Sequence, residues 1–347
     1  METRMTNLLG IKYPIMLAGM GFIADDPKLV AAVSNAGGLG LLATSVLTPE
    51  QTRAAVRQVR ALTDKPFAAN VTLQFAYARE DAEVLLEEKV PVINWSLGNA
   101  DWIIRAAHEY GGKVLGTVVR ARHALRAEQD GADALIVTGH EAAGHGGDVT
   151  SLVLIPAIAS RVKIPVIAAG GFCDGKGLVA ALALGAEGIS MGTAFMLTKE
   201  SRLPEHIREL CLKATEEDTL YLEMPDGLGG RLLKTRAAEI MASERLSLMK
   251  SLRSAMEIKR MLDIPMWRLL LDGLKARSIQ GLAHQAIRAT SLRSAILDGD
   301  ERVGTMTVGQ VIGRINDVPT CKELIDRIVA EAEEIIEATR EKVFAQG

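Results

Sequence analysis

The chain has 347 residues, of which 48% are hydrophobic, 24% charged and 4% aromatic. Lysine and arginine together number 40 against 43 for aspartate and glutamate, so the net charge is −3 and offers no basic surface for a nucleic-acid backbone. The apolar content and the scattered glycines exclude a disordered or a collagen-like chain and indicate a globular protein with a large core.

The cysteines and the apolar runs predict the compartment. Cys173, Cys211 and Cys321 form no pair at metal-ligand spacing and no disulfide framework, which indicates a reducing environment. The start of the chain has no apolar signal segment. No uncharged run reaches the ~20 residues that a bilayer span needs. We therefore expect a cytoplasmic protein that binds neither membrane nor nucleic acid.

The first two hundred residues alternate short apolar runs with amphipathic ones, as consecutive βαβ units require. Helical spacing predicts helices between the strands, among them one over residues 49–62 with Thr48 as N-cap and Gln51 in a capping box. Eight such units indicate an α/β fold, a closed (β/α)8 TIM barrel, in preference to a doubly wound open sheet. The predicted strands are 15–18, 39–43, 67–70, 92–95, 114–118, 134–137, 166–169 and 188–191.

Beyond residue 198 the strand signal disappears, and the chain becomes charged and helical in period. We therefore predict three parts: the barrel over residues 1–200, a helical insertion subdomain over 201–300, and a segment over 301–347 whose last helix, 320–343, packs back on the barrel. The insertion is also a candidate for a homodimer interface. Its methionines are predicted to fill the core of the insertion: Met241, Met249, Met256, Met261 and Met266.

Glycine-rich turns follow two neighbouring strands of the predicted barrel. Gly170-Gly171 ends the seventh strand and Gly192-Thr193 ends the eighth. Barrels of this class carry the active site at the C-terminal ends of the strands and commonly bind a phosphate after strands seven and eight. Glycine lets backbone N–H groups approach phosphate oxygens closely. We predict a phosphate site there. The alternative is that both glycine pairs only make tight turns.

Two histidines lie in the loop after the sixth strand. His140 and His145 share the glycine-rich stretch 139–147, and glycines flank His145 on both sides. An imidazole above a cofactor can take or give a proton near neutral pH. No nucleophilic triad and no third metal ligand accompanies them, so covalent and metal mechanisms are second choices and no metal site is predicted. His145 is the histidine whose backbone can bring it close to a ligand. The other histidines are read as surface or core residues: His108, His123, His206 and His284.

These motifs resemble the nitronate monooxygenases, once called 2-nitropropane dioxygenases. Members of that family are FMN-containing (β/α)8 barrels, close to the flavin-dependent enoyl-acyl-carrier-protein reductases. The resemblance covers about residues 5–200 well and the region from Gly304 onward more loosely. It is carried by residues 14–20, 70–73, 139–145, 169–175 and 191–195.

The resemblance implies FMN as cofactor and a place for each matching residue. Gly19, Met20 and Asn70 would lie along the flavin ring, and Gly144 beneath the cofactor. His145 falls on the family's catalytic histidine, and Thr307 resembles a small polar position that closes over the substrate. The residues that would hold the phosphate are Ala169, Gly170, Gly171, Met191, Gly192 and Thr193.

Three positions depart from the family pattern. Thr138 stands where an acidic residue usually precedes the glycine, so a ribityl or ring contact to FMN is changed there. Thr117 replaces a basic or apolar residue, and Ala194 replaces an arginine that often follows Gly-Thr. These changes affect the selection of substrate more than the binding of FMN.

The resemblance implies an activity on small molecules. The leading prediction is oxidation of alkyl nitronates or nitroalkanes with O2 to a carbonyl compound and nitrite, with His145 as the base. The alternative is an NAD(P)H-dependent flavin reductase of enoyl thioesters or quinones. A third hypothesis, a non-catalytic barrel that binds a phosphorylated ligand, leaves His145 without a role.

Overall fold

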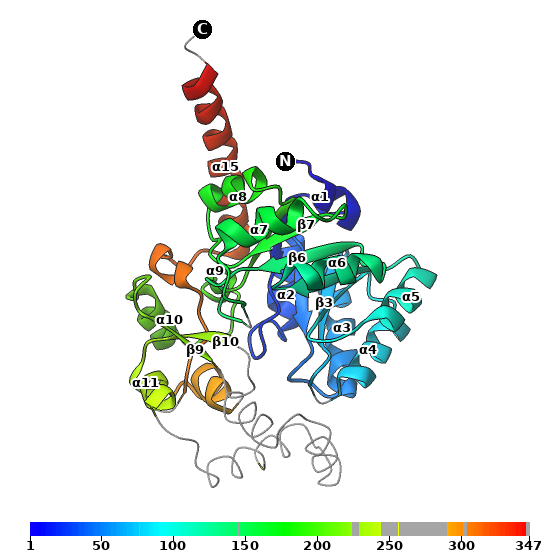
Figure 1. The fold of residues 1–347 in the computed structure, drawn as a ribbon. Coiled ribbons are helices and arrows are strands. Elements are labelled where there is room, and N and C mark those ends of the chain that lie inside the picture. Colours follow the sequence, from blue (N-terminus) through cyan, green and yellow to red (C-terminus); the bar gives the residue numbers. More distant parts are fainter. Residues whose placement is uncertain are drawn as a thin grey trace. The chain divides into compact units, whose positions relative to one another are not determined.

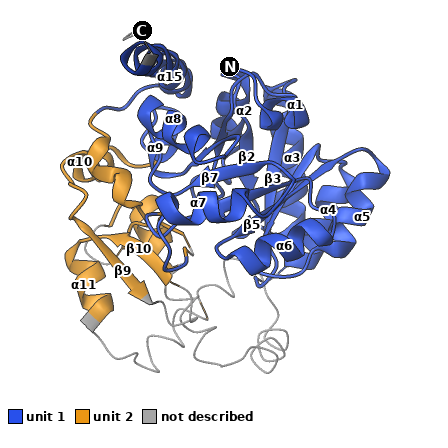
Figure 2. Cartoon of the chain, turned by 45° about the horizontal axis from the view of Figure 1, so that its top comes forward, with its two compact units in different colours: residues 1–141, 147–201, 317–347 blue, residues 142–146, 202–316 orange. Residues whose placement is uncertain are grey.

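The computed structural model describes residues 1–75, 77–144, 146–223, 229–243, 256, 290–300 and 304–344. The chain divides into two compact units, coloured separately in Figure 2. Unit 1 comprises residues 1–141, 147–201 and 317–347, and unit 2 comprises residues 142–146 and 202–316.

Unit 1 is built on eight parallel strands that form a barrel (Figure 1). Each strand bonds to the next in the order β1-β8-β7-β6-β5-β4-β3-β2. The ring closes between β1 and β2, where the Leu17 amide donates to the Leu39 carbonyl and the Leu39 amide donates to the Ile15 carbonyl, both at 2.9 Å. The predicted (β/α)8 barrel is confirmed. The strands are β1 (Ile15–Leu17), β2 (Gly40–Ala43), β3 (Phe67–Thr72), β4 (Val92–Ser96), β5 (Lys113–Val118), β6 (Ala134–Thr138), β7 (Val166–Ala169) and β8 (Gly188–Met191).

Helices, most of them amphipathic, cover the outside of these strands. In α3 the side chain of Thr48 accepts from the Gln51 amide while the Gln51 side chain accepts from the Thr48 amide, which is the predicted capping box. The apolar face of α3 is buried, including Val56 and Val59. The helices of this part are α1 (Arg4–Leu9), α2 (Pro27–Asn35), α3 (Pro49–Leu62), α4 (Ala78–Glu87), α5 (Asp101–Glu109), α6 (Ala121–Gln129), α7 (Ser151–Ala159) and α8 (Gly175–Ala183).

The eighth barrel helix comes from the C-terminal end of the chain. Directly after β8 the chain makes the short α9 (Thr193–Met196). The long α15 (Cys321–Phe344) lies beside α8 (Figure 1) and also packs against α2. The Gly175 amide at the start of α8 donates to Glu331 Oε2 at 2.7 Å. A Cβ on Gly175 would lie 2.6 Å from the amide nitrogen of Ala332, so this close approach requires glycine. Residues 202–316 are thus inserted between β8 and its barrel helix.

Unit 2 contains a β-hairpin that the sequence analysis missed. Its strands are antiparallel, β9 (Thr219–Glu223) and β10 (Gly229–Leu233). Buried Leu232 of β10 packs with Ala238 and with the partly buried Leu220 and Leu222. The expectation of a purely helical insertion was wrong here, because two five-residue strands give little alternation within a charged, helix-like segment. The helices of unit 2 include α10 (Glu205–Leu212), α11 (Arg236–Ser243) and the 3₁₀ turn η1 (Gln310–Arg314).

The predicted core methionines of the insertion behave differently from one another. Met241 packs against the cluster of Leu232 and Ala238, as expected of a core residue. Met256 is 45% exposed, so its predicted core position is wrong. Met249, Met261 and Met266 lie outside the described residues. In the described part of the chain, no helix combines the length and the apolar content that crossing a bilayer needs.

Candidate active site

The carboxyl ends of the barrel strands bring most of the predicted cofactor residues to one rim of unit 1. Parallel register places the end of β1 beside the end of β8, with Leu17 opposite Met191. It also places Thr138 of β6 opposite Ala169 of β7. The predicted residues found at this rim are Gly19, Met20, Asn70, Thr138, Ala169, Gly170, Gly171, Met191, Gly192 and Thr193.

Buried amides link three strand ends on one side of the rim. Asn70 Nδ2 donates to Asn94 Oδ1 at 2.7 Å, and Asn94 Nδ2 donates to the Leu115 carbonyl at 2.9 Å and lies 3.0 Å from Thr117 Oγ1. Asn70 is 8% and Asn94 2% exposed, so their orientation is fixed by these bonds. A Cβ on Gly19 would lie 3.2 Å from Oδ1 of Asn70, which places the turn after β1 directly against this amide. Asn94 was not among the predicted site residues, although a polar residue inside a buried strand was the available signal.

The turn after β7 has a backbone conformation that favours glycine. Gly170 has a φ of 95° and Gly171 a φ of 85°, a region that costs other residues about 1–2 kcal/mol. A Cβ on Gly192 would lie 3.2 Å from the sulfur of Met20. Two consecutive glycines after β7 and Gly192-Thr193 after the neighbouring β8 present backbone N–H groups with few side chains, an arrangement that fits a phosphate group.

Glu141 ties the loop after β6 to the turn after β7. Both of its carboxylate oxygens accept from the Ser151 amide at the start of α7, at 2.9 and 3.1 Å. The Ser151 hydroxyl lies 3.0 Å from Glu141 Oε2 and 2.8 Å from the Gly170 carbonyl. A Cβ on Gly139 would lie 2.1 Å from that hydroxyl oxygen, so Gly139 is required for the arrangement. The Glu141 carboxylate therefore accepts hydrogen bonds at the N-terminus of α7.

The two histidines of this loop differ in what the structure places around them. The His140 amide donates to the Val149 carbonyl at 2.9 Å, and His140 Nδ1 lies 3.0 Å from the Gly147 carbonyl. A carbonyl only accepts, so Nδ1 carries the proton in that bond. His140 thus joins the start of the loop to Gly147 and Val149 at its end. His145 lies outside the described residues. Its neighbour Gly144 is exposed, and no heavy atom lies within 4 Å of the place where a Cβ would stand.

The remaining candidate, Thr307, belongs to unit 2. It pairs with Leu232 of β10 in an antiparallel bridge. Residues 142–146 of the histidine loop are also part of unit 2. For metals, no group of three or more histidine, cysteine, aspartate or glutamate side chains within the described ranges could hold an ion.

Asp81 is a buried carboxyl in the helix that follows β3. Its side chain is 1% exposed, and the Thr52 hydroxyl donates to its Oδ1 at 2.8 Å. Burial raises the pKa of Asp81 to about 7, and the hydrogen bond from Thr52 only partly opposes this shift. The carboxyl is therefore mostly protonated in the folded protein below neutral pH.

We expect Asp81→Asn to remove a pH dependence from the stability. An aspartate in the unfolded chain titrates near 3.9, so the folded state binds this proton more tightly and the free energy of unfolding falls as the pH rises from about 4 through 7. Asparagine can accept from Thr52 without a charge. The variant should exceed the parent in unfolding free energy by roughly 1–3 kcal/mol at pH 8 and by much less at pH 4.5.

Urea unfolding at pH 4.5, 6 and 8 measures that difference. Asp64→Asn, at an exposed aspartate, is the control and should follow the parent at each pH. A constant difference between Asp81→Asn and the parent across this range would contradict the shifted pKa.

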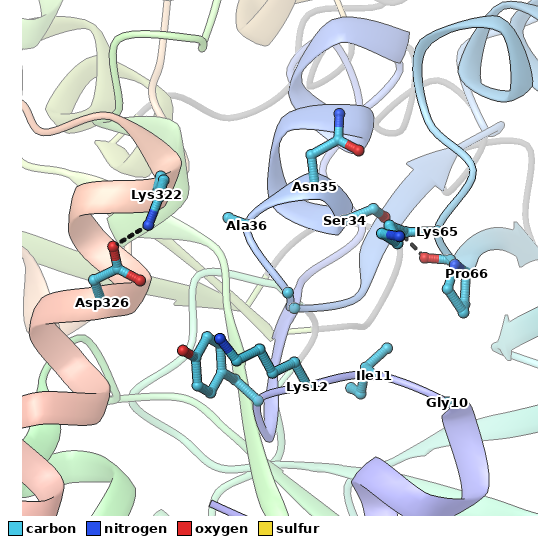
Figure 3. Close-up of a pocket in the computed structure, with 13 residues that line it drawn as sticks. Gly10, Ile11, Lys12, Ser34, Asn35, Ala36, Lys65, Pro66, Lys322 and Asp326 are labelled. Carbon is cyan, nitrogen blue, oxygen red and sulfur yellow. Dashed lines mark hydrogen bonds and ion pairs between the residues drawn. The ribbon is translucent and has the colours of Figure 1, made fainter.

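A cavity of about 350 Å³ lies elsewhere in unit 1 (Figure 3). It is lined by residues 10–13 before β1 and 34–38 before β2, together with Lys65, Pro66, Lys322 and Asp326. Lys322 and Asp326 form an ion pair within α15, and the Ser34 hydroxyl donates to the Pro66 carbonyl at 2.9 Å. The cavity lies at the amino ends of the strands, so it is separate from the rim that carries the predicted cofactor residues.

Comparison with known proteins adds to this geometry. A family model described as nitronate monooxygenase matches residues 2–84 and 73–331. The (3aS,4S,5R,7aS)-5-hydroxy-7a-methyl-1-oxo-octahydro-1H-indene-4-carboxyl-CoA dehydrogenase of Rhodococcus jostii is 36% identical over 345 residues, covering 97% of this chain and 98% of the relative. A probable nitronate monooxygenase of Staphylococcus aureus is 32% identical over 287 residues, covering 70% and 81%. The structure of FabK from Thermotoga maritima matches with a TM-score of 0.84 at 35% identity and covers 99% of both chains.

Proposed function

The chain belongs to the nitronate monooxygenase family, a family of flavin-dependent oxidoreductases, and we propose that it is an FMN-dependent dehydrogenase of a ring-bearing β-hydroxyacyl-CoA thioester. The observation that carries the substrate class is the extent of similarity to the Rhodococcus jostii dehydrogenase. That match covers 97% of this chain, whereas the match to the Staphylococcus aureus relative covers 70%. As the name of that relative states, its substrate carries the hydroxyl at ring position 5, adjacent to position 4, which bears the carboxyl-CoA thioester.

The rim of unit 1 would hold FMN. The backbone of Gly170, Gly171, Gly192 and Thr193 would bind the phosphate. The three glycines have no side chain to keep phosphate oxygens away from their N–H groups, and Gly170 and Gly171 have positive φ values. Asn70, fixed by Asn94, would face the flavin ring together with Gly19 and Met20. Thr138, Ala169 and Met191 would complete the contact from the strand ends, and Gly144 would lie beneath the cofactor. Bound FMN supplies the two-electron redox chemistry.

His145 would act as the base. A hydroxyl that is oxidised to a ketone gives up a proton and a hydride, and an imidazole that titrates near neutral pH suits removal of the proton. Thr307, which lies in the segment that pairs with Leu232 of β10, would contact the substrate.

Nitronate oxidation is the second candidate. The family model and the Staphylococcus aureus relative favour it. A nitro group, like a thioester, makes a neighbouring C–H acidic, so the same histidine could take that proton while O2 serves as the oxidant. Reduction of enoyl thioesters or quinones by NADH or NADPH is the remaining alternative from the sequence.

Anaerobic stopped-flow absorbance distinguishes these functions. The purified protein should be yellow and release FMN on denaturation. Mixing it with 2-hydroxycyclohexanecarboxyl-CoA should bleach the flavin within seconds. Bleaching by propyl-2-nitronate but not by the thioester would replace the proposal with the second candidate, and bleaching only by NADH or NADPH would replace it with a reductase. A protein that binds no FMN after reconstitution would contradict all three.

A further inference from the structure

The outer edge of strand β10 holds two separate segments of unit 2. The Arg231 amide donates to the Ala143 carbonyl at 3.0 Å, and the Leu233 amide donates to the Met306 carbonyl at 2.8 Å. Amides two residues apart in a strand point to the same edge, so both bonds lie on the edge of β10 away from β9. Residues 142–146 and the segment at Thr307 therefore lie one after the other along this edge.

Tyr221 of β9 holds the other end of the same loop. Its hydroxyl donates to the Gly146 carbonyl at 3.1 Å. A Cβ on Gly229 would lie 1.7 Å from this hydroxyl oxygen, so the glycine provides the space that the tyrosine needs. The loop is thus bonded at Ala143 and at Gly146, on the two sides of residue 145 in the chain.

Arg231 fixes the tyrosine ring. It stands directly opposite Tyr221 in the hairpin, so the two side chains share one face. The guanidinium carbon lies 5.4 Å from the centre of the Tyr221 ring, and Nη1 donates to the Thr219 hydroxyl at 3.1 Å. Arg231 is 4% exposed, and a buried guanidinium over an aromatic face restricts the ring more than an exposed one does.

We propose that Tyr221 and Arg231 are positioning residues that hold the loop of residues 142–146 for the reaction. The hairpin bonds fix the backbone on both sides of His145, and the same edge of β10 brings Thr307 alongside that loop. The inserted hairpin, whose strand β10 also pairs with Thr307, therefore holds Ala143 and Gly146. This inference rests on the proposed role of His145.

Tyr221→Phe tests the proposal because it keeps the ring and removes only the hydroxyl that bonds Gly146. We expect the rate of flavin reduction by saturating 2-hydroxycyclohexanecarboxyl-CoA to fall about tenfold or more, since small misplacement of a catalytic group is costly. FMN content and the half-saturating thioester concentration should not change. Gly229→Ala displaces the same hydroxyl and should act in the same direction.

Tyr110→Phe is the matched control. The Tyr110 hydroxyl also donates to a carbonyl, that of Val90, at 2.9 Å, but it lies in unit 1 after α5. This variant should keep the parent rate. In a His145→Ala background, Tyr221→Phe should cause no further loss, because Tyr221 acts through residue 145.

The outcomes separate this inference from the function on which it rests. If His145→Ala reduces its flavin slowly and Tyr221→Phe matches the parent rate, the positioning role of Tyr221 is wrong and the role of His145 as base is retained. An equal loss from Tyr221→Phe in both backgrounds would also overturn the positioning role. If His145→Ala keeps the parent rate, the proposed base itself is wrong.

Discussion

Replacing His145 by alanine is expected to slow flavin reduction by about 10²–10⁴-fold while the FMN content stays unchanged. The proposed phosphate cradle belongs to the turns after β7 and β8 in unit 1, whereas residues 142–146 belong to unit 2, so the variant should leave these turns intact. Anaerobic reduction by the thioester measures the rate, and the absorbance of FMN released on denaturation measures the content. Added imidazole should restore part of the rate if the missing group is a base.

The control is a histidine with a surface role. His108 Nε2 lies 2.9 Å from Asp133, and its side chain is 41% exposed, so His108→Ala should keep the parent rate. Equal losses of rate and FMN in His145→Ala would make His145 a structural residue. A parent-like rate would move the base to another group.

The barrel was predictable because each buried parallel strand is a short, continuous apolar run between helical segments. Val166–Ala169 and Gly188–Met191 have the bounds that the sequence predicted. The capping box of Thr48 and Gln51 fixed the start of α3 for a local reason, since both side chains bond within the first helical turn. Features that depend on residues within one helical turn can therefore be predicted from the sequence.

Long-range arrangements were not predictable in the same way. The last helix was expected to pack on the barrel, but no local pattern says that α15 takes the place between α8 and α2. Likewise, the bond from Asn70 to Asn94 depends on the pairing of β3 with β4, which a single sequence does not encode locally. The hairpin escaped notice because its apolar residues, Leu220 and Leu222, alternate over only five positions.

The candidate site was predictable to the extent that it depends on strand ends. The rule that barrel chemistry lies at the carboxyl ends selected Gly170, Gly171 and Gly192, which the structure places on adjacent turns. The sequence did not show that His140 bonds to the Gly147 carbonyl, because this contact forms only when the loop closes on itself. FMN, the cytoplasmic location and the homodimer remain predictions.

Gly171→Ala is expected to weaken FMN binding by roughly 10–100-fold, the loss of about one charge-assisted hydrogen bond. Gly171 has a φ of 85°, so alanine there strains the turn that would present N–H groups to the phosphate. Its Cβ would meet the Cβ of Glu141 at 3.5 Å, an ordinary contact, so the change does not block folding sterically. Titration of the apoprotein with FMN, followed by quenching of flavin fluorescence, measures the dissociation constant.

Gly111→Ala separates this effect from the general cost of a strained residue. Gly111 has a φ of 81° and nothing within 4 Å of a Cβ, and it follows α5 at the amino-end side of the strands. Both variants should lose about 1–2 kcal/mol of unfolding free energy as apoproteins, because both force alanine into the left-handed region. Only Gly171→Ala should lose affinity for FMN. Equal FMN affinities in the two variants would place the phosphate away from the turn after β7, and with it the cofactor away from the rim beside Asn70.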